Sequence, residues 1–247
     1  MNLLVDLGNS RIKWSTPEEL VQEHVASRSC ADLQKVLTDE WGCLEIPDKI
    51  WISSVANANL TNLLTAWIKD EWNLLPITVR SCSKQLGVIN GYEDPVQLGV
   101  DRWMAMIGAR MLKKQACVIV DCGTATTIDS IDTEGKHLGG LILPGLQLMH
   151  EALWRNTAIP KLEMSYEHSV YAKDTLSGIK SAAILATGCL VNDVVGRLQE
   201  RVGEETVCIL TGGAGEELKD YIKFDTCYEP NLVLKGLALV AAQIADI

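Results

Sequence analysis

One short turn occurs twice in this 247-residue chain, each time after an apolar strand. The first copy runs Asp6-Leu-Gly8-Asn9, and the second runs Asp121-Cys-Gly123-Thr124. The second aspartate follows the first by 115 residues, which is close to half of the chain. Because Asp, Gly and Asn are common turn residues, either copy alone would indicate an ordinary hairpin turn. Their recurrence in the same polar order predicts a duplicated fold.

Similar patterns of strands and helices follow the two turns. Strands are expected at 3–7, 11–15, 20–26, 49–53 and 77–80 in the first half, with helices at 31–39, around 60–68 and from residue 100. Residues 81–99 are expected to form a loop. In the second half we expect strands at 117–121, 122–129, 138–143 and 207–210, a helix around 184–198 and a closing apolar helix at 232–244. We therefore predict an α/β duplication with halves 1–115 and 116–247 and a ligand cleft between them.

Charge and composition argue against several classes of partner. The chain has 22 basic and 32 acidic residues, a net charge of -10 that repels a nucleic-acid backbone. The apolar runs are short and interrupted, so no membrane-spanning segment is expected. The N-terminus lacks a secretory pattern, and the eight cysteines are scattered as expected for reduced thiols, which favours a cytoplasmic protein. The four dispersed histidines predict solvated or capping roles and no metal site.

The two turns carry the residue types that phosphoryl transfer requires. This reaction needs backbone amides and positive charge around the phosphates, carboxylates for Mg2+ and a group that orients the attacking hydroxyl. Glycine lets a backbone turn approach a phosphate closely, and its exposed N–H groups can form an anion-binding nest. Asp6 and Asp121 end their strands and are candidates for the metal and phosphate region.

Five motifs, in order, resemble those of the type III pantothenate kinases, of the superfamily of acetate and sugar kinases, actin and the seventy-kilodalton chaperones. Any one of them is weak, but together they span nearly the whole chain. The resemblance implies duplicated actin-like (ribonuclease H-like) half-domains with an interlobe nucleotide cleft. The five motifs are Asp6-Leu-Gly-Asn-Ser10, Gly99-Val-Asp101-Arg102, Asp121-Cys-Gly-Thr-Ala-Thr126, Gly139-Gly-Leu-Ile-Leu-Pro-Gly145 and Leu210-Thr-Gly-Gly213.

The resemblance implies an ATP site with two kinds of metal ion. Asp6 is expected near Mg2+, and Asn9, Ser10 and Lys13 near the ATP phosphates. Asp121 matches the position that helps to hold a monovalent cation, K+ or NH4+. The implied ATP-binding residues are Asp6, Leu7, Gly8, Asn9, Ser10, Arg11, Ile12, Lys13 and Thr124.

The resemblance also implies a pocket for pantothenate. Asp101 matches the general base, although it could simply cap the helix that begins near it. Arg102 suits the substrate carboxylate because its guanidinium can grip one bidentately, the alternative being an exposed surface arginine. Thr175 is expected to reach the pocket from the partner subunit of a homodimer with a shared active site. The implied substrate-binding residues are Tyr92, Gly99, Val100, Asp101, Arg102 and Thr175.

The function implied is ATP-dependent phosphorylation of the 4'-hydroxyl of pantothenate, the first step of coenzyme A biosynthesis. Two positions depart from the family pattern: Ser10 replaces a common threonine, and Ala214 stands where an acidic or amide residue is frequent, which leaves the contacts to the adenine base open. The alternatives are a regulatory protein of the Bvg accessory factor type, a superfamily kinase for another small hydroxy acid, and a non-catalytic nucleotide-dependent clamp. The regulatory alternative predicts loss of catalytic residues, whereas Asp6, Asp101, Arg102 and Asp121 are present.

Overall fold

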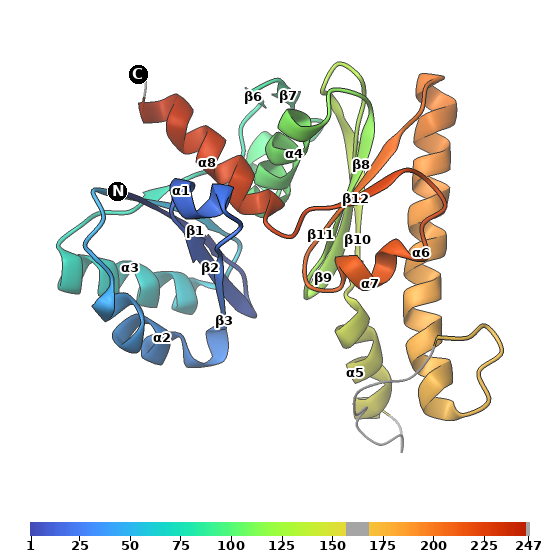
Figure 1. Cartoon of the computed structure of the whole chain (residues 1–247), viewed down its shortest axis with the longest axis horizontal. Helices are drawn as coiled ribbons and strands as arrows, with labels where there is room; N and C mark the ends of the chain where they lie inside the picture. Colours follow the sequence, from blue (N-terminus) through green and yellow to red (C-terminus); the bar gives the residue numbers. More distant parts are fainter. Residues whose placement is uncertain (157–167, 246–247) are drawn as a thin grey trace. The chain divides into compact units, whose positions relative to one another are not determined.

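The chain forms two compact units in a computed structural model that describes residues 1–156 and 168–245 (Figure 1). Unit 1 comprises Met1–Leu112 together with Asn231–Ile247, and unit 2 comprises Lys113–Pro230. This division differs from the predicted halves 1–115 and 116–247 mainly at the C-terminus. The closing helix belongs to the unit that contains the N-terminus, because its apolar face packs there and not on its sequence neighbours.

Unit 1 is built on a five-stranded mixed sheet in the order β3-β2-β1-β4-β5. The strand β1 pairs antiparallel with β2 around the first turn and parallel with β4 on its other side. The strands are β1 (Asn2–Leu7), β2 (Arg11–Ser15), β3 (Ala26–Ser29), β4 (Lys49–Ser54) and β5 (Ile77–Thr78). The helices of the unit are α1 (Pro17–Val21), α2 (Leu33–Asp39), α3 (Ala58–Trp72), α4 (Val100–Leu112) and α8 (Leu232–Ala245).

One face of this sheet packs on α2 and α3 (Figure 1). Alternate residues of β1, Leu3, Val5 and Leu7, enter this core because successive side chains of a strand point to opposite faces. The core also holds a tryptophan cluster in which the Trp41 and Trp72 rings stack with centroids 5.4 Å apart. Asp6 therefore lies on the other face of the sheet, the face that α8 and α4 contact.

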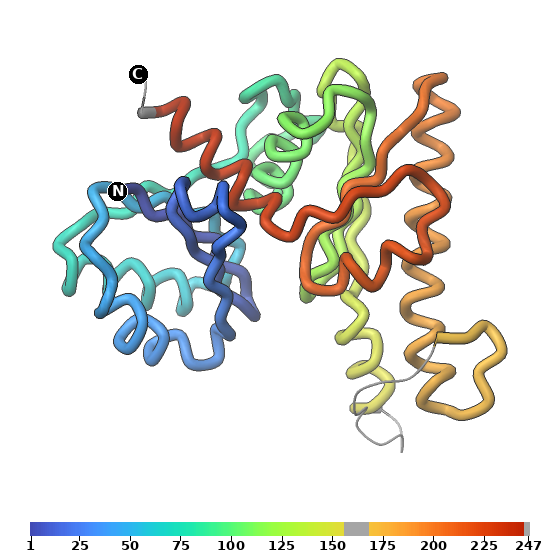
Figure 2. Tube along the Cα trace, viewed as in Figure 1, coloured from blue at the N-terminus to red at the C-terminus, as the bar shows by residue number. Residues whose placement is uncertain are grey.

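Glycines allow α8 to lie directly against α4 and beside β1, although both elements are far from α8 in sequence (Figure 2). A side chain at Gly108 would come within 2.6 Å of the Leu232 carbonyl oxygen, and one at Gly236 would overlap the Met104 carbonyl. The close approach buries the apolar sides of both helices, which explains why the closing helix leaves the second half of the sequence.

Unit 2 repeats the topology of unit 1 with the strand order β10-β9-β8-β11-β12. Its first strand again pairs antiparallel with the next strand and parallel with a later one, which confirms the duplicated α/β fold. The strands are β8 (Cys117–Cys122), β9 (Ala125–Ile131), β10 (His137–Pro144), β11 (Val207–Thr211) and β12 (Thr226–Tyr228), and the helices are α5 (Leu146–Asn156), α6 (Thr175–Val202) and α7 (Gly215–Lys219).

The helix α6 corrects the expectation that no segment could span a membrane. It is the one helix in the described residues that is long and apolar enough to do so by length and composition. Its buried residues Ile184, Val191, Val195 and Leu198 pack on Val118, Val120 and Leu210 of the sheet. One face of α6 thus belongs to the core of unit 2, while only 39% of its apolar window is buried.

Local chemistry overturns the strand predicted at 20–26. Thr16 accepts a hydrogen bond from the Glu19 amide at 3.1 Å while the Glu19 carboxylate accepts one from the Thr16 amide, and Pro17 opens the helix. This capping box starts α1, and β3 begins only at Ala26. Shorter elements that the prediction treated as loop or helix are β6 (Lys84–Gln85), β7 (Val88–Ile89) and the 3-10 helices η1 (Cys30–Asp32), η2 (Trp41–Cys43) and η3 (Pro95–Gln97).

His137 corrects the expectation of solvated or capping histidines. Its side chain is fully buried, and its Nε2 lies 2.9 Å from the Asp129 Oδ1 across the β9–β10 pair. All eight cysteines are free.

Candidate active site

The first turn is closed by backbone bonding between β1 and β2. The Gly8 amide donates to the Arg11 carbonyl at 2.9 Å. Asp6 is paired across the strands with Lys13 and on its other side with Ser53. Paired residues of adjacent strands project from the same face, so a carboxylate, an ammonium group and a hydroxyl group occupy one patch at the ends of β1 and β4.

Asn9 does not simply extend from this turn toward solvent. Its Nδ2 donates to the Val55 carbonyl at 3.1 Å, and its Oδ1 accepts from the Asn57 amide at 3.0 Å. Asn57 is itself the N-cap of α3. The side chain predicted to lie near the ATP phosphates therefore joins the first turn to the loop between β4 and α3.

Cys30 holds the turn from η1, a contact that sequence reasoning missed. Its amide donates to the Ser10 carbonyl at 2.9 Å, and its Sγ lies 3.4 Å from the Gly8 carbonyl oxygen, to which the thiol donates. Burial raises the pKa of the Cys30 thiol, so it stays protonated and able to donate at neutral pH. No signal in the sequence distinguishes this cysteine from the other seven.

The second turn has the same place in unit 2 but a shorter loop. The Gly123 amide donates to the Ala125 carbonyl at 3.2 Å, and Asp121 is paired with Thr127 and Thr211. Three residues separate the last paired residues, Cys122 and Thr126, whereas four separate Leu7 and Ile12 in the first turn. Thr124 is exposed at the tip of this turn, as a ligand-binding residue must be.

Two glycines of other loops pack directly on the second turn. The Gly145 amide donates to the Thr124 carbonyl at 2.9 Å, and a side chain at Gly145 would come within 2.6 Å of that oxygen. Gly212 has a φ of 81°, and a side chain there would overlap the Asp121 carboxylate and come within 2.6 Å of the Cys122 carbonyl carbon. Both positions therefore require glycine, and three loops meet at the ends of β8 and β11.

Asp101 lies in the first turn of α4. The Gly99 carbonyl accepts the first helical hydrogen bond, from the Trp103 amide at 3.0 Å, so Gly99 and not Asp101 occupies the cap position. The Asp101 Oδ1 accepts from the Arg102 amide at 2.8 Å, and a side chain at Gly99 would come within 2.6 Å of this oxygen. A carboxylate at this position interacts favourably with the helix dipole and so stabilises α4, whether or not it also takes part in catalysis.

Arg102 is buried, which overturns the alternative of an exposed surface arginine. Only 6% of the residue is accessible, its Nη1 donates to the Tyr92 hydroxyl at 2.9 Å, and its guanidinium lies 5.6 Å from the centre of the Tyr92 ring. The structure thus joins two of the residues predicted to bind substrate. A stacked and buried guanidinium is a preorganised group for a carboxylate.

Two polar side chains that the sequence analysis did not select support this region. Asn90 accepts from the Tyr92 amide at 2.9 Å and donates to the Cys82 and Pro95 carbonyls, both at 3.2 Å. The Ser81 hydroxyl donates to the Leu98 carbonyl at 2.8 Å. The Asn90-Gly91 dipeptide was a detectable signal, because it is a frequent turn sequence.

A cavity of about 400 Å3 adjoins the predicted substrate residues Gly99 and Val100 within unit 1. It extends from Ser54 at the end of β4, and from the following Val55 that Asn9 holds, to the start of α4. Arg80 provides a positive charge in its wall. The full lining comprises Ser54, Val55, Thr78, Val79, Arg80, Ser81, Val96, Gln97, Leu98, Gly99 and Val100.

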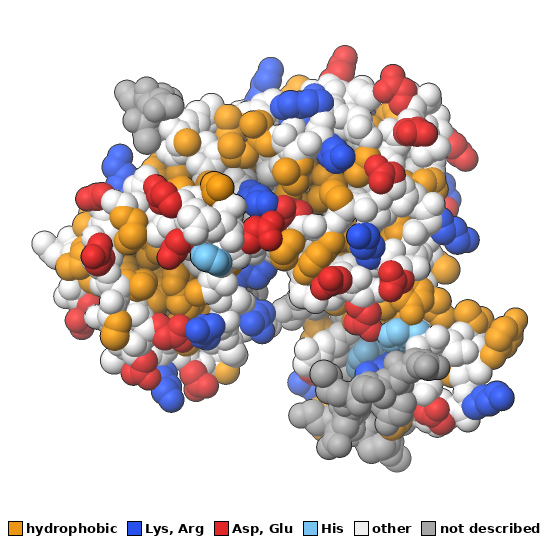
Figure 3. Space-filling model, in the orientation of Figure 1, with side chains coloured by type: hydrophobic (Ala, Val, Ile, Leu, Met, Phe, Trp, Pro, Cys, Tyr) orange, Lys and Arg blue, Asp and Glu red, His pale blue; other side chains and the backbone are white. Residues whose placement is uncertain are grey.

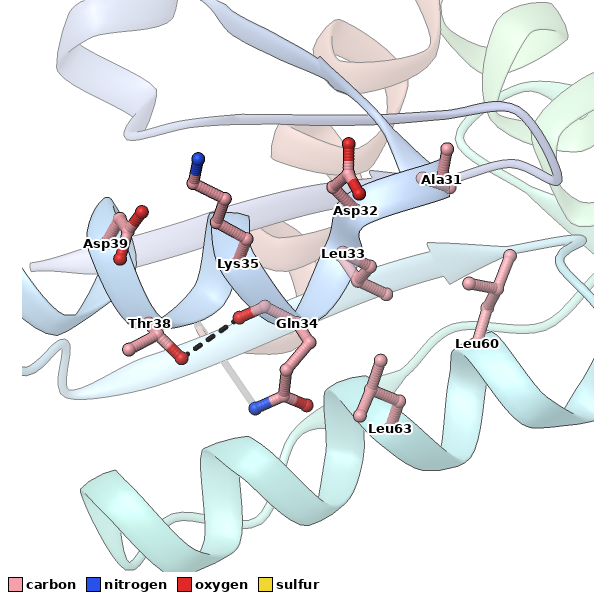
Figure 4. A pocket seen from close by; sticks show the side chains of 10 residues that line it. Ala31, Asp32, Leu33, Gln34, Lys35, Thr38, Asp39, Leu60 and Leu63 are labelled. Carbon is pink, nitrogen blue, oxygen red and sulfur yellow. Dashed lines mark hydrogen bonds between the residues drawn. The ribbon is translucent and has the colours of Figure 1, made fainter.

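An open groove of about 540 Å3 lies on the opposite side of the sheet, between α2 and α3 (Figure 4). Its lining includes the apolar side chains of Leu33, Leu60 and Leu63. Cys30 also lines it. Lys35 and Asp39 border it with opposite charges. None of the predicted catalytic or binding residues lines this groove.

Thr175 is exposed and is the first residue of α6 in unit 2. The preceding Asp174 caps the helix by accepting from the Ser177 amide at 2.9 Å and from the Ser177 hydroxyl at 2.6 Å. These bonds lower the pKa of Asp174 and hold the exposed helix end in place. They leave Thr175 at the surface, where a second subunit can reach it.

The described residues contain no group of three or more His, Cys, Asp or Glu side chains placed to hold a metal ion. The loops around Asp121 present a carboxylate beside packed backbone carbonyls, the hard oxygen donors that a monovalent cation prefers.

Comparison with solved structures defines the class of the fold. A protein from Campylobacter jejuni assigned to the Baf family of transcriptional activators has a TM-score of 0.65 at 20% identity, with 99% of this chain and 100% of that chain covered. An activator of 2-hydroxyisocaproyl-CoA dehydratase from Clostridium difficile, solved with bound ADPNP, has a TM-score of 0.51 at 13% identity, covering 99% and 95%. These likenesses confirm the predicted actin-like α/β fold.

Sequence comparison defines the family within that class. The family model for type III pantothenate kinase matches residues 2–197. The type III pantothenate kinase of Nitrosospira multiformis is 34% identical, covering 99% of this chain and 92% of its own, and that of an Azoarcus species is 36% identical, covering 98% and 91%. The chain therefore belongs to the type III pantothenate kinase family.

Proposed function

We infer that this chain is a pantothenate kinase, which transfers the terminal phosphoryl group of ATP to the 4'-hydroxyl of pantothenate in the first step of coenzyme A biosynthesis. The observation that carries the inference is membership of the kinase family over nearly the whole chain. The hydrogen-bonded Arg102 and Tyr92 beside Asp101 also support it. Pantothenate has a carboxylate, which the Arg102 guanidinium suits, and a hydroxyl group, which the Asp101 carboxylate suits.

Residues 6–13 and Thr124 are proposed to bind ATP through the two turns. The backbone amides of the turns and the Lys13 ammonium group suit the phosphates, and Asp6 suits Mg2+. When bound, Mg2+ would neutralise charge on the transferring phosphoryl group. The pairing of Lys13 with Asp6 across β1 and β2 supports placing both near the same phosphates.

Asp121 is proposed to help hold K+ or NH4+. Its carboxylate lies at the end of β8, where the Gly145 and Gly212 loops pack against the turn. A monovalent cation there would offset the negative charge that Asp121 brings close to the phosphates.

Asp101 is proposed to accept the proton of the attacking hydroxyl while Arg102 and Tyr92 hold the pantothenate carboxylate. The cavity lined by Gly99 and Val100, which precede Asp101 in the chain, would provide space for the body of the substrate. The bond between the Asp101 Oδ1 and the Arg102 amide would fix the direction in which the carboxylate faces the hydroxyl.

A homodimer with a shared active site is proposed because Thr175 and hydrophobic side chains are exposed on unit 2. Hydrophobic side chains gather on the segment before α6 (Figure 3), where Val170 and Tyr171 are 73% and 85% exposed. Leu141 and Ile142 are exposed on β10, an edge strand of the sheet. An exposed apolar edge strand of this kind favours pairing with another chain.

Complementation tests the shared site. An inactive Asp101→Asn chain and an inactive Thr175→Trp chain are co-expressed with different tags, and the heterodimer is isolated. One of its two sites would contain both intact residues, so we expect roughly half of the parental activity from the symmetry of the dimer. A heterodimer no more active than the two homodimers would show that Thr175 does not serve a partner's site.

The substrate is tested by measuring ADP release with a panel of small hydroxy acids. We expect pantothenate to give a far higher kcat/KM than the other acids, because the Arg102 and Tyr92 pair and Asp101 must both engage one molecule. A higher value for another hydroxy acid would favour a different superfamily kinase, and a lack of turnover despite ATP binding would favour the regulatory or clamp alternatives. We propose a cytoplasmic location, in keeping with a metabolic kinase.

A further inference from the structure

The side chain of Asn9 uses both of its polar atoms on backbone groups of one distant loop. The bond to the Asn57 amide is 3.0 Å long and the bond to the Val55 carbonyl is 3.1 Å long. An amide held at both ends cannot rotate toward a ligand without breaking two hydrogen bonds, one of which would leave the amide at the start of α3 without its partner. The Asn9 side chain therefore connects the first turn to the loop before α3 and does not point toward a ligand.

The opposite side of the same turn is held by Cys30, which binds the Gly8 and Ser10 carbonyls. In a trans peptide the carbonyl and the following N–H point in opposite directions. Because the Gly8 carbonyl points toward Cys30, the Asn9 N–H points away from it. The Asn9 side chain, together with the thiol and the backbone amide of Cys30, thus restricts the directions in which the amides of the turn point.

The shape of the first turn explains why it needs such support. It has one more unpaired residue than the second turn, and each additional residue adds conformational entropy that binding must remove. In the second turn, Gly145 and Gly212 pack directly on the backbone and restrict it. The glycines within the two turns are equally open: a side chain at Gly8 would lie 3.4 Å from the Arg11 carbonyl oxygen, and one at Gly123 would lie 3.5 Å from the Ala125 carbonyl oxygen. The difference between the turns therefore lies in the loops that pack on the second one.

We propose that Asn9 is a positioning residue, which ties the first turn to the loop before α3 and so holds the amides of the turn in their ATP-binding arrangement before the nucleotide arrives. The proposal deepens the proposed function, because it assumes that residues 6–13 bind the ATP phosphates. It assigns direct phosphate contacts to the backbone, Ser10 and Lys13, and not to the Asn9 side chain.

The partner residue Asn57 provides a test that leaves the turn itself unchanged. Its φ of -62° is one that proline adopts, and Asn57→Pro removes the N–H that donates to Asn9 and the side chain that accepts from the Leu60 amide. Proline also restricts the backbone of Ala56, an effect that the Asn9→Ala background controls for. Asn57→Ala removes the same side chain but retains the N–H. The difference between the two variants therefore isolates the hydrogen bond to Asn9.

Binding of a non-hydrolysable ATP analogue is measured by calorimetry without pantothenate, together with kcat and KM for ATP. We expect Asn57→Pro to bind the analogue about fivefold more weakly than Asn57→Ala, because a fraction of the turns must be reordered on binding. The KM for ATP should rise in parallel while kcat at saturating ATP stays within about twofold. In an Asn9→Ala background the two Asn57 variants should bind equally.

Hydrogen exchange of the Asn57 amide in the parent protein gives a second test, which does not depend on the folding of a variant. If Asn9 is a support, this amide stays protected when the ATP analogue binds. If Asn9 turns to the phosphates instead, the protection falls on binding and the proposal is wrong. Equal binding by Asn57→Pro and Asn57→Ala, or a difference that persists in the Asn9→Ala background, would also overturn it.

The outcome separates this proposal from the proposed function. Binding of the ATP analogue without turnover of pantothenate would contradict the proposed substrate. The role of Asn9 would still be tested by the affinities of the Asn57→Pro and Asn57→Ala variants for the analogue. A parent protein that does not bind the analogue at all would contradict both.

Discussion

The two half-domains place equivalent Asp-x-Gly turns at the ends of equivalent strands but stabilise them differently. In unit 1, the side chains of Asn9 and Cys30 hold a four-residue turn by hydrogen bonds. In unit 2, Gly145 and Gly212 press on a three-residue turn by direct backbone packing. The two copies thus share the topology and the aspartates, but different contacts stabilise their turns. Hydrogen-bonded support tolerates small adjustments, whereas close packing does not tolerate an added carbon atom.

The largest expected effect concerns Asp101, the proposed proton acceptor, which lies in unit 1 and has no proposed counterpart in unit 2. We expect Asp101→Asn to lower kcat by about 100-fold or more, because the group that accepts the hydroxyl proton is lost. The fold should be unaffected, since the Gly99 carbonyl receives the first helical bond and asparagine can still accept from the Arg102 amide. Steady-state kinetics and thermal unfolding check this, with the exposed Asp70→Asn as control. Parental turnover would show that Asp101 only stabilises the helix.

The next effect tests the packing of the second turn. We expect Gly212→Ala to lower the free energy of unfolding by about 3 kcal/mol, because its positive φ and the overlap with Asp121 both oppose a side chain. Gly213→Ala is the matched control, since a side chain there meets nothing within 4 Å, and Gly8→Ala tests the first turn. Chemical denaturation measures all three. If Gly8→Ala cost as much as Gly212→Ala, the proposed difference between the turns would be wrong.

A smaller effect on turnover is expected from the monovalent cation, which Asp121 of the second turn is proposed to bind and Asp6 of the first turn is not. Turnover in K+ or NH4+ should exceed that in Na+ by about tenfold, because carbonyl and carboxylate oxygens replace the hydration shell of K+ more readily than that of the more strongly hydrated Na+. Asp121→Asn should weaken this preference, whereas substitution of Lys13 should not. Rates are compared in buffers that contain a single monovalent cation. Equal rates in Na+ and K+ would remove this role from Asp121.

The smallest effect concerns the thiol that precedes the second turn. Burial raises the pKa of Cys122 from 9.0 to about 12, so the folded state retains a proton that the unfolded state loses. Its contribution to stability is complete below about pH 9 and falls as the pH rises toward 12, by about 1 kcal/mol between about pH 8 and pH 10. Cys122→Ala should remove this part of the alkaline loss in denaturation experiments. Cys30→Ala gives the comparison for the first turn, where burial also raises the pKa of the thiol.

Much of the fold was predictable because its signals are local. Alternating apolar residues identified the strands around both turns, and the recurrence of Asp-x-Gly identified the duplication and the candidate aspartates. The strand predicted at 20–26 failed because the capping box of Thr16 and Glu19 was not weighed against the apolar pattern. That error was avoidable, since a Thr-Pro-Glu-Glu sequence is itself a helix-start signal.

The candidate site was predictable to a smaller extent. The sequence indicated Tyr92, Asp101 and Arg102, but neither the burial of Arg102 nor its bond to Tyr92 follows from residues that are 10 positions apart across an irregular loop. The family resemblance predicted that Asn9 lies near the ATP phosphates. Its actual partners, Val55 and Asn57, lie 46 and 48 positions away.

The sequence by itself determined the duplicated α/β topology, the two turns and the glycines in them, because strand periodicity and turn geometry depend on neighbours within a few residues. Only the tertiary structure decided that α8 packs in unit 1, that Asn9 and Cys30 hold the first turn, and that Gly145 and Gly212 hold the second. These contacts join segments far apart in the chain, and they form where packing and hydrogen bonding satisfy buried groups that local sequence cannot satisfy alone.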